Sequence, residues 1–419
     1  MEKEHLETRL RALYALDGRE ESLSAARARV AQLEETFGKR FPGREAAFFS
    51  GPGRTELGGN HTDHQRGHVL CASVDMDILA CAAPNDQGVV RLASEGYPEI
   101  KVDLRDLSVH PEEANTSAAL VRGVCAAIRN LGYDLRGFDG CAVSTVLPGS
   151  GLSSSAAWEV LLGQIMNHFC CGGALDAVTI AQVGQYAENV YFGKPSGLMD
   201  QMGAAVGGAV AIDFGSEDAP VVRRVEYDFA KSGHVLCLVD TASDHADLTA
   251  DYAAITQEMG AVAERFGKSV LREVSEEDFR ASLPELRKSC GDRAVLRAMH
   301  YYADDRRAVQ EAEALAKGDF PAFLRLVNES GLSSAVNLQN TWSIAHPRQQ
   351  AVPVCLAVGR ELLAGRGAIR VHGGGFGGTV QAFVPEELLE DFRTGMEAVV
   401  GRGRCHVLHI RSVGACRLR

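Results

Sequence analysis

A glycine and serine segment, LPGSGLSSSAA, has a composition suited to binding an anion. Gly149 and Gly151 can adopt backbone angles that other residues avoid, and the serines from Ser153 to Ser155 stand where a helix is expected to begin. The unpaired amides at a helix N-terminus attract phosphate, and serine hydroxyls can add hydrogen bonds or reach a metal ion. The segment therefore indicates a phosphate site, with an ordinary helix cap after a tight turn as the alternative.

Three common nucleotide-binding motifs do not fit the chain. No GxxxxGK[ST] sequence occurs, which excludes the P-loop class. The DFG sequence at Asp213 has no HRD loop to accompany it, so it does not indicate a protein kinase. The stretch from Gly373 to Gly378 satisfies GxGxxG, but it leads into the strand-like run TVQAFV and not into a helix. The phosphate site therefore belongs to another class.

A second polar segment, GPGRTELGGNHTDHQRGH, lies between two strand-like runs. It brings Arg54, Glu56, His61, Asp63 and His64 into one glycine-rich stretch, and polar side chains on such a loop are well placed to meet a ligand. A zinc site is one alternative, although the cluster lacks a partner motif, and a solvated turn is another.

Two carboxylates accompany a third segment, KPSGLMDQ. Asp200 follows Ser196 and Gly197 by about one turn, and a short helix starting there would present it beside a bound ligand. Glu188 lies twelve residues earlier, at the end of the preceding predicted helix. Two such acids can divide the work, one coordinating Mg²⁺ and one receiving a hydroxyl proton. Taken singly, each acid could equally be an ordinary surface residue.

Composition limits the possible partners. The 43 Lys and Arg against 55 Asp and Glu give a net charge of -12, which argues against nucleic acid and anionic membranes, so a phosphate site must be built locally. The eleven cysteines form no CxxC pair, the N-terminus has no apolar signal region, and the apolar stretches are too short to cross a bilayer. We expect a cytoplasmic protein that is a monomer or a weak homo-oligomer.

The surrounding residues predict an α+β fold in two lobes. Residues 1–40 read as a helical appendage with apolar residues at helical spacing. The first lobe, residues 41–215, starts with strands and includes a helix over 116–131. A strand over 140–146 then leads into the serine loop and a helix. The second lobe, residues 216–419, reads as a strand, several helices and a final strand, loop, strand, helix and strand.

Four motifs in this order resemble the galactokinase branch of the GHMP kinases, and they spread over residues 51 to 378. They are GPGRTELGGNHTDH, PGSGLSSSAAWEV, AENVYFGKPSGLMDQ and RVHGGGFGG. The first is similar to the galactokinase signature GR-V-N-L-I-G-E-H-T-D-Y, which separates that branch from the mevalonate and homoserine kinases. The resemblance implies a two-lobed GHMP kinase fold with the active site between the lobes, ATP as co-substrate and Mg²⁺ as cofactor.

The resemblance also implies a role for particular residues. Arg54 is the cation beside the reacting hydroxyl, and Asp200 is the carboxylate that faces it. The implied sugar contacts are Asn60, His61, Asp63, Gly197 and Tyr252. The implied phosphate loop is Gly149, Ser150, Gly151, Leu152, Ser153, Ser154 and Ser155, and the implied metal ligands are Ser155 and Glu188.

The chain departs from the family pattern mainly at sugar-binding positions. Asn60 stands where the signature has glutamate, His64 where it has tyrosine, and Thr55 and Glu56 where it has Val-Asn; Ser196 replaces the usual cysteine. A site built for one hydroxyl pattern can reject another. The expected reaction is therefore phosphorylation of the anomeric hydroxyl of a monosaccharide, with galactose as the first candidate. The alternatives are another sugar such as N-acetylgalactosamine or arabinose, a sugar sensor without turnover, and a kinase for an acyclic alcohol.

Overall fold

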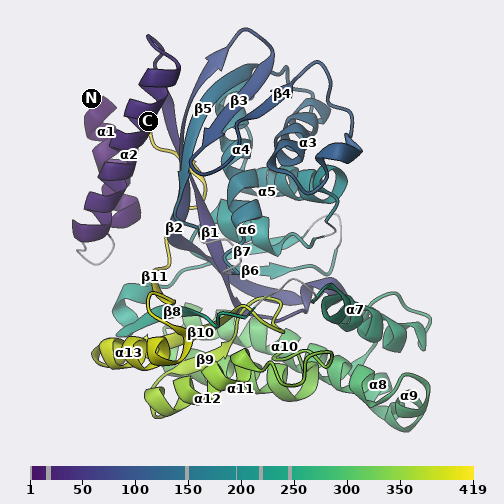
Figure 1. The fold of residues 1–419 in the computed structure, drawn as a ribbon. Coiled ribbons are helices and arrows are strands. Elements are labelled where there is room, and N and C mark those ends of the chain that lie inside the picture. Colours follow the sequence, from purple (N-terminus) through teal and green to yellow (C-terminus); the bar gives the residue numbers. More distant parts are fainter. Residues whose placement is uncertain (1, 16–19, 147–150, 195, 217–219, 244–247) are drawn as a thin grey trace.

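Two long strand-forming runs make the centre of the larger sheet. β1 (Ala47–Gly58) and β2 (His68–Asn85) pair antiparallel, from Ala47 opposite Ala82 to Gly58 opposite Leu70. Almost all their side chains are buried, so both faces of the sheet must be covered. In the computed structural model, helices lie on both faces (Figure 1). The structure describes residues 2–15, 20–146, 151–194, 196–216, 220–243 and 248–419.

In the described part of the chain the larger sheet has eight strands. Six follow the order β12-β1-β2-β5-β3-β4, while β6 pairs with the first part of β2 and β7 pairs with β6. The strands besides β1 and β2 are β3 (Val89–Ser94), β4 (Ile100–Asp103), β5 (Gly137–Ser144), β6 (Ala209–Asp213), β7 (Val221–Val225) and β12 (Cys416–Arg417). The register of β1 shifts between Pro52 and Arg54 and again between Glu56 and Gly58. Such irregularities redirect side chains, and here they flank Arg54 and Glu56.

Four helices cover one face of this sheet. They are α3 (Ser117–Asn130), α4 (Ser154–Cys170), α5 (Ala177–Tyr186) and α6 (Met199–Val206). Apolar side chains such as Phe49 and Ala80 form the main core with the first three of them, and the fourth, α6, packs in a neighbouring cluster with Val69 and Cys71 of β2. α5 continues into a π-helical turn, Ala187–Phe192. Because α4 and α6 both pack against β1 and β2, their first turns lie near the strand that carries Arg54.

The N-terminal helices α1 (Glu2–Tyr14) and α2 (Glu20–Arg40) cover the opposite face (Figure 1). Apolar residues at helical spacing on α2, including Leu33 and Phe37, are buried with Phe48 and Leu79 of the sheet. Successive strand residues alternate between the two faces, which is why Phe48 belongs to this cluster and Phe49 to the main core.

Asp77 of β2 lies fully buried between these N-terminal helices and the sheet. Arg29 of α2 contacts its carboxylate at 2.8 Å and Arg411 contacts it at 3.1 Å, while Tyr14 of α1 also donates a hydrogen bond to it. Charges from the two ends of the chain therefore meet at one buried acid. The backbone of Asp77 in turn pairs with Thr145, just before the phosphate loop.

The second lobe has a smaller sheet with four strands in the described part of the chain, in the order β11-β8-β10-β9. These strands are β8 (His234–Asp240), β9 (Ala368–Val371), β10 (Thr379–Pro385) and β11 (Cys405–Leu408). The helices are α7 (Thr249–Glu264), α8 (Glu276–Ala281), α9 (Leu283–Ser289), α10 (Asp292–Ala316), α11 (Phe320–Ser333), α12 (Ala351–Leu363) and α13 (Leu389–Val400).

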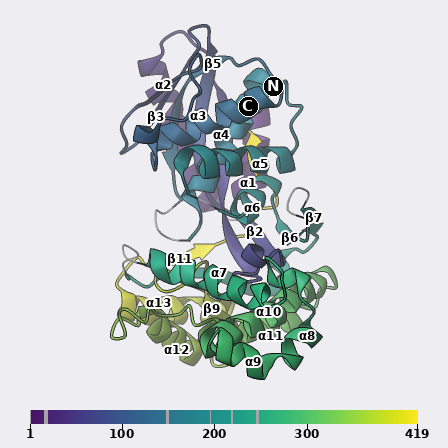
Figure 2. The same ribbon diagram turned by 90° about the vertical axis from the view of Figure 1, so that its right-hand side faces the viewer.

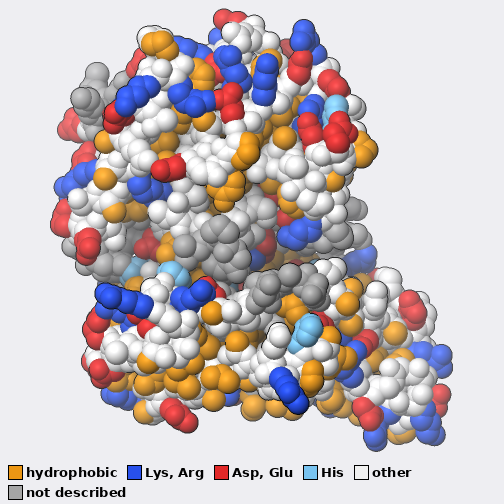
Figure 3. All heavy atoms as spheres, viewed as in Figure 1, with side chains coloured by type: hydrophobic (Ala, Val, Ile, Leu, Met, Phe, Trp, Pro, Cys, Tyr) orange, Lys and Arg blue, Asp and Glu red, His pale blue; other side chains and the backbone are white. Residues whose placement is uncertain are grey.

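The two lobes stack along the long axis of the molecule, and α10 of the second lobe packs against β1 and β2 of the first (Figure 2). On the face drawn in Figure 3, Lys and Arg side chains are interspersed with Asp and Glu over both lobes. The prediction of a two-lobed α+β fold is confirmed, as is the strand, loop and helix order around the serine segment. The boundaries at residues 40 and 215 stay predictions.

Candidate active site

Arg54, Ser153 and Asp200 form a cluster that we call the reaction cluster. Arg54 comes from β1, Ser153 immediately precedes α4, and Asp200 lies in the first turn of α6. Arg54 Nε donates to Asp200 Oδ1 at 2.7 Å and Ser153 Oγ donates to Asp200 Oδ2 at 2.7 Å. Both carboxylate oxygens are thus held from different elements, which fixes the orientation of the acid.

The surroundings of Asp200 keep it ionised. Burial alone would raise the pKa of this carboxyl, but the charge of Arg54 and the hydrogen bonds from Ser153 and Arg54 outweigh it, so the pKa lies below its ordinary value. The Asp200 side chain is nevertheless 23% exposed, unlike the nearly buried Arg54. An ionised carboxylate that still faces solvent can accept a proton from a bound hydroxyl.

The described part of the predicted phosphate loop begins at Gly151, because Gly149 and Ser150 lie outside the described residues. Gly151 has a φ of +73°, and a Cβ there would lie 2.9 Å from Nδ1 of His372, so only glycine fits. Leu152 accepts the backbone N–H of Arg54 at 3.1 Å through its carbonyl. The loop is therefore attached to the strand of the reaction cluster.

α4 begins at Ser154, directly after the loop, as the sequence predicted. Ser153 precedes it with a left-handed φ of 55°, and its hydroxyl bonds to Asp200 and not to the first turn of the helix. The first-turn amides of α4 are thus not capped by this side chain, which is the arrangement that an anion site needs.

Ser155 and Glu188, the two predicted metal ligands, are brought together. Ser155 Oγ donates to Glu188 Oε1 at 3.0 Å. The other oxygen of Glu188 accepts from Ser196 Oγ at 2.5 Å and from Gln201 Nε2 at 2.9 Å. A serine hydroxyl and a carboxylate are hard oxygen donors, and Mg²⁺ often takes one or two such protein ligands together with substrate phosphates.

The described residues contain no group of three or more His, Cys, Asp or Glu side chains that could hold a metal ion by itself. A single carboxylate and a hydroxyl beside a phosphate loop fit Mg²⁺ that is shared with a nucleotide. His61, Asp63 and His64, all of them described, form no such metal-binding group, so the geometry does not support the zinc alternative.

Two of the predicted sugar contacts, Asp63 and Gly197, lie against each other. Asp63 lies so close to Gly197 that a Cβ at position 197 would be 2.7 Å from Asp63 Oδ2, so a side chain there would displace the acid. Gly197 in turn precedes the helix that carries Asp200. The loop with His61 and Asp63 is thereby placed next to the reaction cluster.

His61 and Tyr252 both face the glycine loop of the fourth motif. His61 Nε2 lies 2.9 Å from the carbonyl of Gly374, and Tyr252 Oη donates to the carbonyl of Gly375 at 2.9 Å. Burial and the neighbouring His64 lower the pKa of His61 to about 4. In the neutral ring, Nε2–H donates to Gly374 and Nδ1 becomes an acceptor suited to a sugar hydroxyl.

Asn60 is placed differently from the other predicted sugar contacts, because its side chain is 0% exposed. Its Nδ2 donates to Glu56 Oε1 at 3.0 Å and to the carbonyl of Gly373 at 2.8 Å, and its Oδ1 accepts from Asn340 Nδ2 at 2.8 Å. Ser334 also donates to Oδ1, at 3.2 Å. The amide is thus paired with protein groups, and its role as a direct sugar contact stays a prediction.

The sequence did not predict that Glu56 is a buried partner of Asn60 and Arg370. Its carboxylate pairs with the fully buried Arg370 as well as with Asn60. Burial raises the pKa of Glu56 to about 7 despite the nearby charges of Arg370 and Arg54. Glu56 stands where the family signature has asparagine, and Asn60 stands where it has glutamate. This exchange was the signal in the sequence that the two residues are partners. We call Glu56, Asn60, Ser334, Asn340 and Arg370 the Asn60 network.

Lys194 and His372 were also missed. Lys194 Nζ lies 3.0 Å from Glu188 Oε1, although the residue stands in the quoted segment KPSGLMDQ. The ring of His372 lies against Gly151. Its Nε2 is 3.0 Å from Thr55 Oγ1, and its Nδ1 is 3.0 Å from Thr379 Oγ1. A histidine ahead of the glycine loop in RVHGGGFGG could have drawn attention to this contact.

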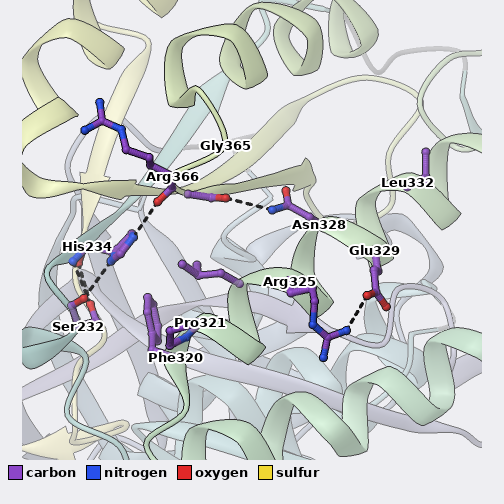
Figure 4. Close-up of a pocket in the computed structure, with 12 residues that line it drawn as sticks. Ser232, His234, Phe320, Pro321, Arg325, Asn328, Glu329, Leu332, Gly365 and Arg366 are labelled. Atoms are coloured by element: carbon purple, nitrogen blue, oxygen red, sulfur yellow. Dashed lines mark hydrogen bonds and ion pairs between the residues drawn. The ribbon is translucent and has the colours of Figure 1, made fainter.

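A cavity of about 650 Å³ in the second lobe is separate from this site (Figure 4). Phe320, Pro321 and Leu324 supply apolar walls, and none of the predicted site residues lines it. Several of its polar groups are paired with protein groups, as Arg325 is with Glu329 at 2.7 Å and Asn328 with the carbonyl of Gly367 at 3.0 Å. The convergence of ionised groups therefore identifies the reaction cluster, and not this cavity, as the candidate active site.

The comparisons with known proteins agree with this geometry. The galactokinase galactose-binding signature matches residues 34–84, and the GHMP kinases N terminal domain matches residues 119–208. Both matched segments contain residues of the site. The described helices include none that is both long and apolar enough to cross a membrane.

Among individual proteins, the chain is 32% identical to a galactokinase of Streptomyces coelicolor over 355 residues, which cover 84% of this chain and 87% of the relative. The structure of Lactococcus lactis galactokinase complexed with galactose matches with a TM-score of 0.78 at 25% identity, covering 93% of this chain and 99% of that one. The mevalonate kinase of Methanococcus jannaschii shares the fold, with a TM-score of 0.62 at 14% identity over 88% and 99% of the two chains. The family prediction is confirmed: this chain belongs to the galactokinase family of the GHMP kinases.

Proposed function

We propose that this protein transfers the terminal phosphoryl group of ATP to the anomeric hydroxyl of galactose, producing galactose 1-phosphate and ADP. The observation that carries the proposal is the reaction cluster, in which an ionised, partly exposed Asp200 is held by Arg54 and Ser153. Asp63 lies close to Gly197, which precedes the helix of Asp200, and these two residues would contact the sugar. The similarity to galactokinases of Streptomyces coelicolor and Lactococcus lactis supports galactose as the acceptor.

In this mechanism, Asp200 accepts the proton of the anomeric hydroxyl while the hydroxyl oxygen attacks the terminal phosphorus. Arg54 keeps Asp200 ionised and stabilises the negative charge that develops nearby. Phosphoryl transfer depends mainly on positioning and charge neutralisation, so a carboxylate fixed by two hydrogen bonds suits it.

The phosphate side of the proposal uses the serine loop. Gly149 to Ser155 would hold the phosphates of ATP through backbone amides and hydroxyls, with the first-turn amides of α4 pointing at them. Ser155 and Glu188 would hold Mg²⁺, which neutralises phosphate charge when bound.

The sugar side uses His61, Asp63, Gly197 and Tyr252. Nδ1 of His61 can accept a sugar hydroxyl because its Nε2 is engaged with Gly374. Asp63 offers a carboxylate acceptor close to Gly197. Asn60 would act from behind these residues by fixing the glycine loop through Gly373. We further propose a cytoplasmic location, in keeping with eleven cysteines that all stay unpaired.

The test is release of ADP by the purified protein with Mg-ATP and galactose, N-acetylgalactosamine, glucose or arabinose. Phosphorus NMR would locate the new phosphate on the anomeric carbon. We expect galactose to be turned over fastest. Faster turnover of another aldose would keep the mechanism and replace the substrate, whereas no ADP release with any sugar would overturn the proposed activity.

A further inference from the structure

Lys194 makes a contact for which the mechanism above has no role. Its Nζ lies 3.0 Å from Glu188 Oε1, the same oxygen that accepts the hydroxyl of Ser155 at 3.0 Å. The Glu188 side chain is 1% exposed whereas that of Lys194 is 53% exposed. The ammonium group therefore reaches a buried carboxylate from the open side of the predicted metal site.

The backbone explains why Lys194 reaches this oxygen. The π-helical turn Ala187–Phe192 contains Glu188 and ends at Gly193, whose φ is +85°. The N–H groups of Gly193 and Lys194 both lie close to the carbonyl of Glu188, at 3.1 and 3.2 Å. The chain thus folds back over Glu188, and π-helical turns of this kind are frequent at functional sites.

The other cation of the site is already committed to protein groups. Arg54 donates through Nε and Nη2 to Asp200 and through Nη1 to the carbonyl of Gly151. Lys194 makes one hydrogen bond within the described residues, and an ammonium group has three donors. Of the two cationic side chains that contact Asp200 or Glu188 in the described part of the chain, Lys194 is the one with donors to spare.

A metal ion at Ser155 and Glu188 would compete with Lys194 for Glu188 Oε1. The second oxygen of Glu188 offers no alternative, because Ser196 and Gln201 already donate to it. The ammonium group would then turn to the nearest other anion. The metal would bring the terminal phosphates of the nucleotide to this place, beside the long and half-exposed lysine side chain.

We propose that Lys194 is a further catalytic residue: its ammonium group rests on Glu188 in the nucleotide-free enzyme and binds the terminal phosphoryl group of ATP once the metal engages Glu188. The inference rests on the proposed kinase function. A lysine that merely neutralised Glu188 would not distinguish ATP from ADP, since both nucleotides share the metal-binding β-phosphate. A lysine that contacts the transferred group must distinguish them.

The test compares binding of Mg-ATP and Mg-ADP by calorimetry without sugar, so that no turnover occurs. The variants are Lys194→Met, Lys194→Arg and the control Lys317→Met, which removes a lysine paired with Glu313 at 3.1 Å on α10. For Lys194→Met we expect at least about tenfold weaker binding of ATP and less than about threefold weaker binding of ADP. Lys194→Arg should recover most of the ATP affinity, and the control should match the wild type.

Equal weakening of both nucleotides, or no weakening, would overturn the role of Lys194. In a parallel assay with sugar, kcat of Lys194→Met should fall at least about tenfold while KM for the sugar stays constant. If ATP binding depends on Lys194 but no sugar is phosphorylated, the contact of Lys194 with the terminal phosphate stands, whereas its catalytic role and the proposed sugar kinase activity are wrong. If sugar is phosphorylated equally by the wild type and Lys194→Met, the proposed function stands and the inference is wrong.

Discussion

The reaction cluster and the Asn60 network meet at β1, which carries Arg54 of the first and Glu56 of the second, but their polar groups are paired in opposite ways. Asp200 is held by Arg54 and Ser153 and still faces solvent, so it can gain a partner when a ligand binds. Asn60 is enclosed, and protein groups satisfy both ends of its amide. Polar residues that lie close together in this fold therefore differ in whether they can still gain a partner.

This difference predicts that substitutions in the two groups of residues affect different properties of the protein, activity in one case and stability in the other. Replacement of Asp200 by an amide of the same shape should remove activity with a smaller change in stability, because the Asp200 side chain is partly exposed to solvent. Loss of a group in the Asn60 network should leave buried donors and acceptors unpaired, which destabilises the fold. The following variants test that division.

Asp200→Asn should have the largest effect. Asparagine preserves the shape but cannot accept the proton, so we expect kcat to fall by about 10² to 10⁴-fold while sugar binding persists. The measurements are steady-state ADP release and calorimetric binding of galactose. Asp240→Asn is a matched control, because Asp240 pairs with Arg404 at 2.6 Å outside the site. A kcat within tenfold of the wild type would show that Asp200 only orients the substrate.

Asn60→Ala should mainly cost stability. Glu56, Ser334 and Asn340 would each lose a partner inside the protein, which predicts a decrease of about 2 to 4 kcal/mol in the free energy of unfolding. We expect KM for the sugar to change less than about tenfold. A hundredfold rise of KM with unchanged urea denaturation would instead assign Asn60 to direct sugar contact.

Exchanging Glu56 and Asn60 tests the structural role of the Asn60 network more sharply. Glu56→Asn and Asn60→Glu together recreate the order of the family signature, whereas each alone puts two acids or two amides side by side. The double variant should be more stable than the sum of the single effects by at least about 1 kcal/mol, since the two residues are in direct contact. Additive effects would show that the two side chains do not act as a pair.

Glu188→Gln should raise the magnesium requirement. The amide retains the shape but lacks the charge that would hold the metal with Ser155, so we expect half-maximal activity to need about tenfold more Mg²⁺ at fixed ATP. Glu313→Gln, which also loses a lysine pair, is the control. An unchanged magnesium dependence would place the metal elsewhere.

His372 should contribute to acid sensitivity. Burial and the charges of Arg54 and Arg370 lower its pKa to about 3, against about 6.5 in the unfolded chain. The folded state then binds fewer protons than the unfolded state between pH 3 and 6.5, so stability falls as the pH is lowered through this window. His372→Asn should reduce this slope by about 1.4 kcal/mol per pH unit, measured by urea denaturation at several pH values.

The sequence predicted the site where a motif carries both the chemistry and the local backbone. The serine run marks the start of α4 and the MDQ segment places Asp200 in a first helical turn, so the reaction cluster could be anticipated. Contacts between distant segments could not. The pairing of Asn60 with Asn340 depends on how α11 continues beside the glycine loop, and the sequence spacing of 280 residues contains no signal for it.

The burial of polar side chains was the property that the sequence predicted least well. Asn60 and Glu56 are polar residues of a kind that often binds ligands, yet both are buried and paired with residues of the second lobe. A lysine such as Lys194 is expected to be solvated at the surface, yet its ammonium group contacts the buried carboxylate of Glu188. Residue type alone does not determine whether a polar group faces a ligand or the interior.

The buried Asp77 bears on how the protein can be shortened. Tyr14 of α1 and Arg29 of α2 both bond to it, so a chain without residues 1–40 would keep the acid and Arg411 inside the fold with fewer partners. The N-terminal helices should accordingly unfold together with β2 as one cooperative unit, and their amides should exchange with deuterium about as slowly as those of the central strands. The backbone of Asp77 also hydrogen-bonds to Thr145, just before the phosphate loop. Removal of the N-terminal helices should therefore also weaken the packing that holds the start of this loop in place.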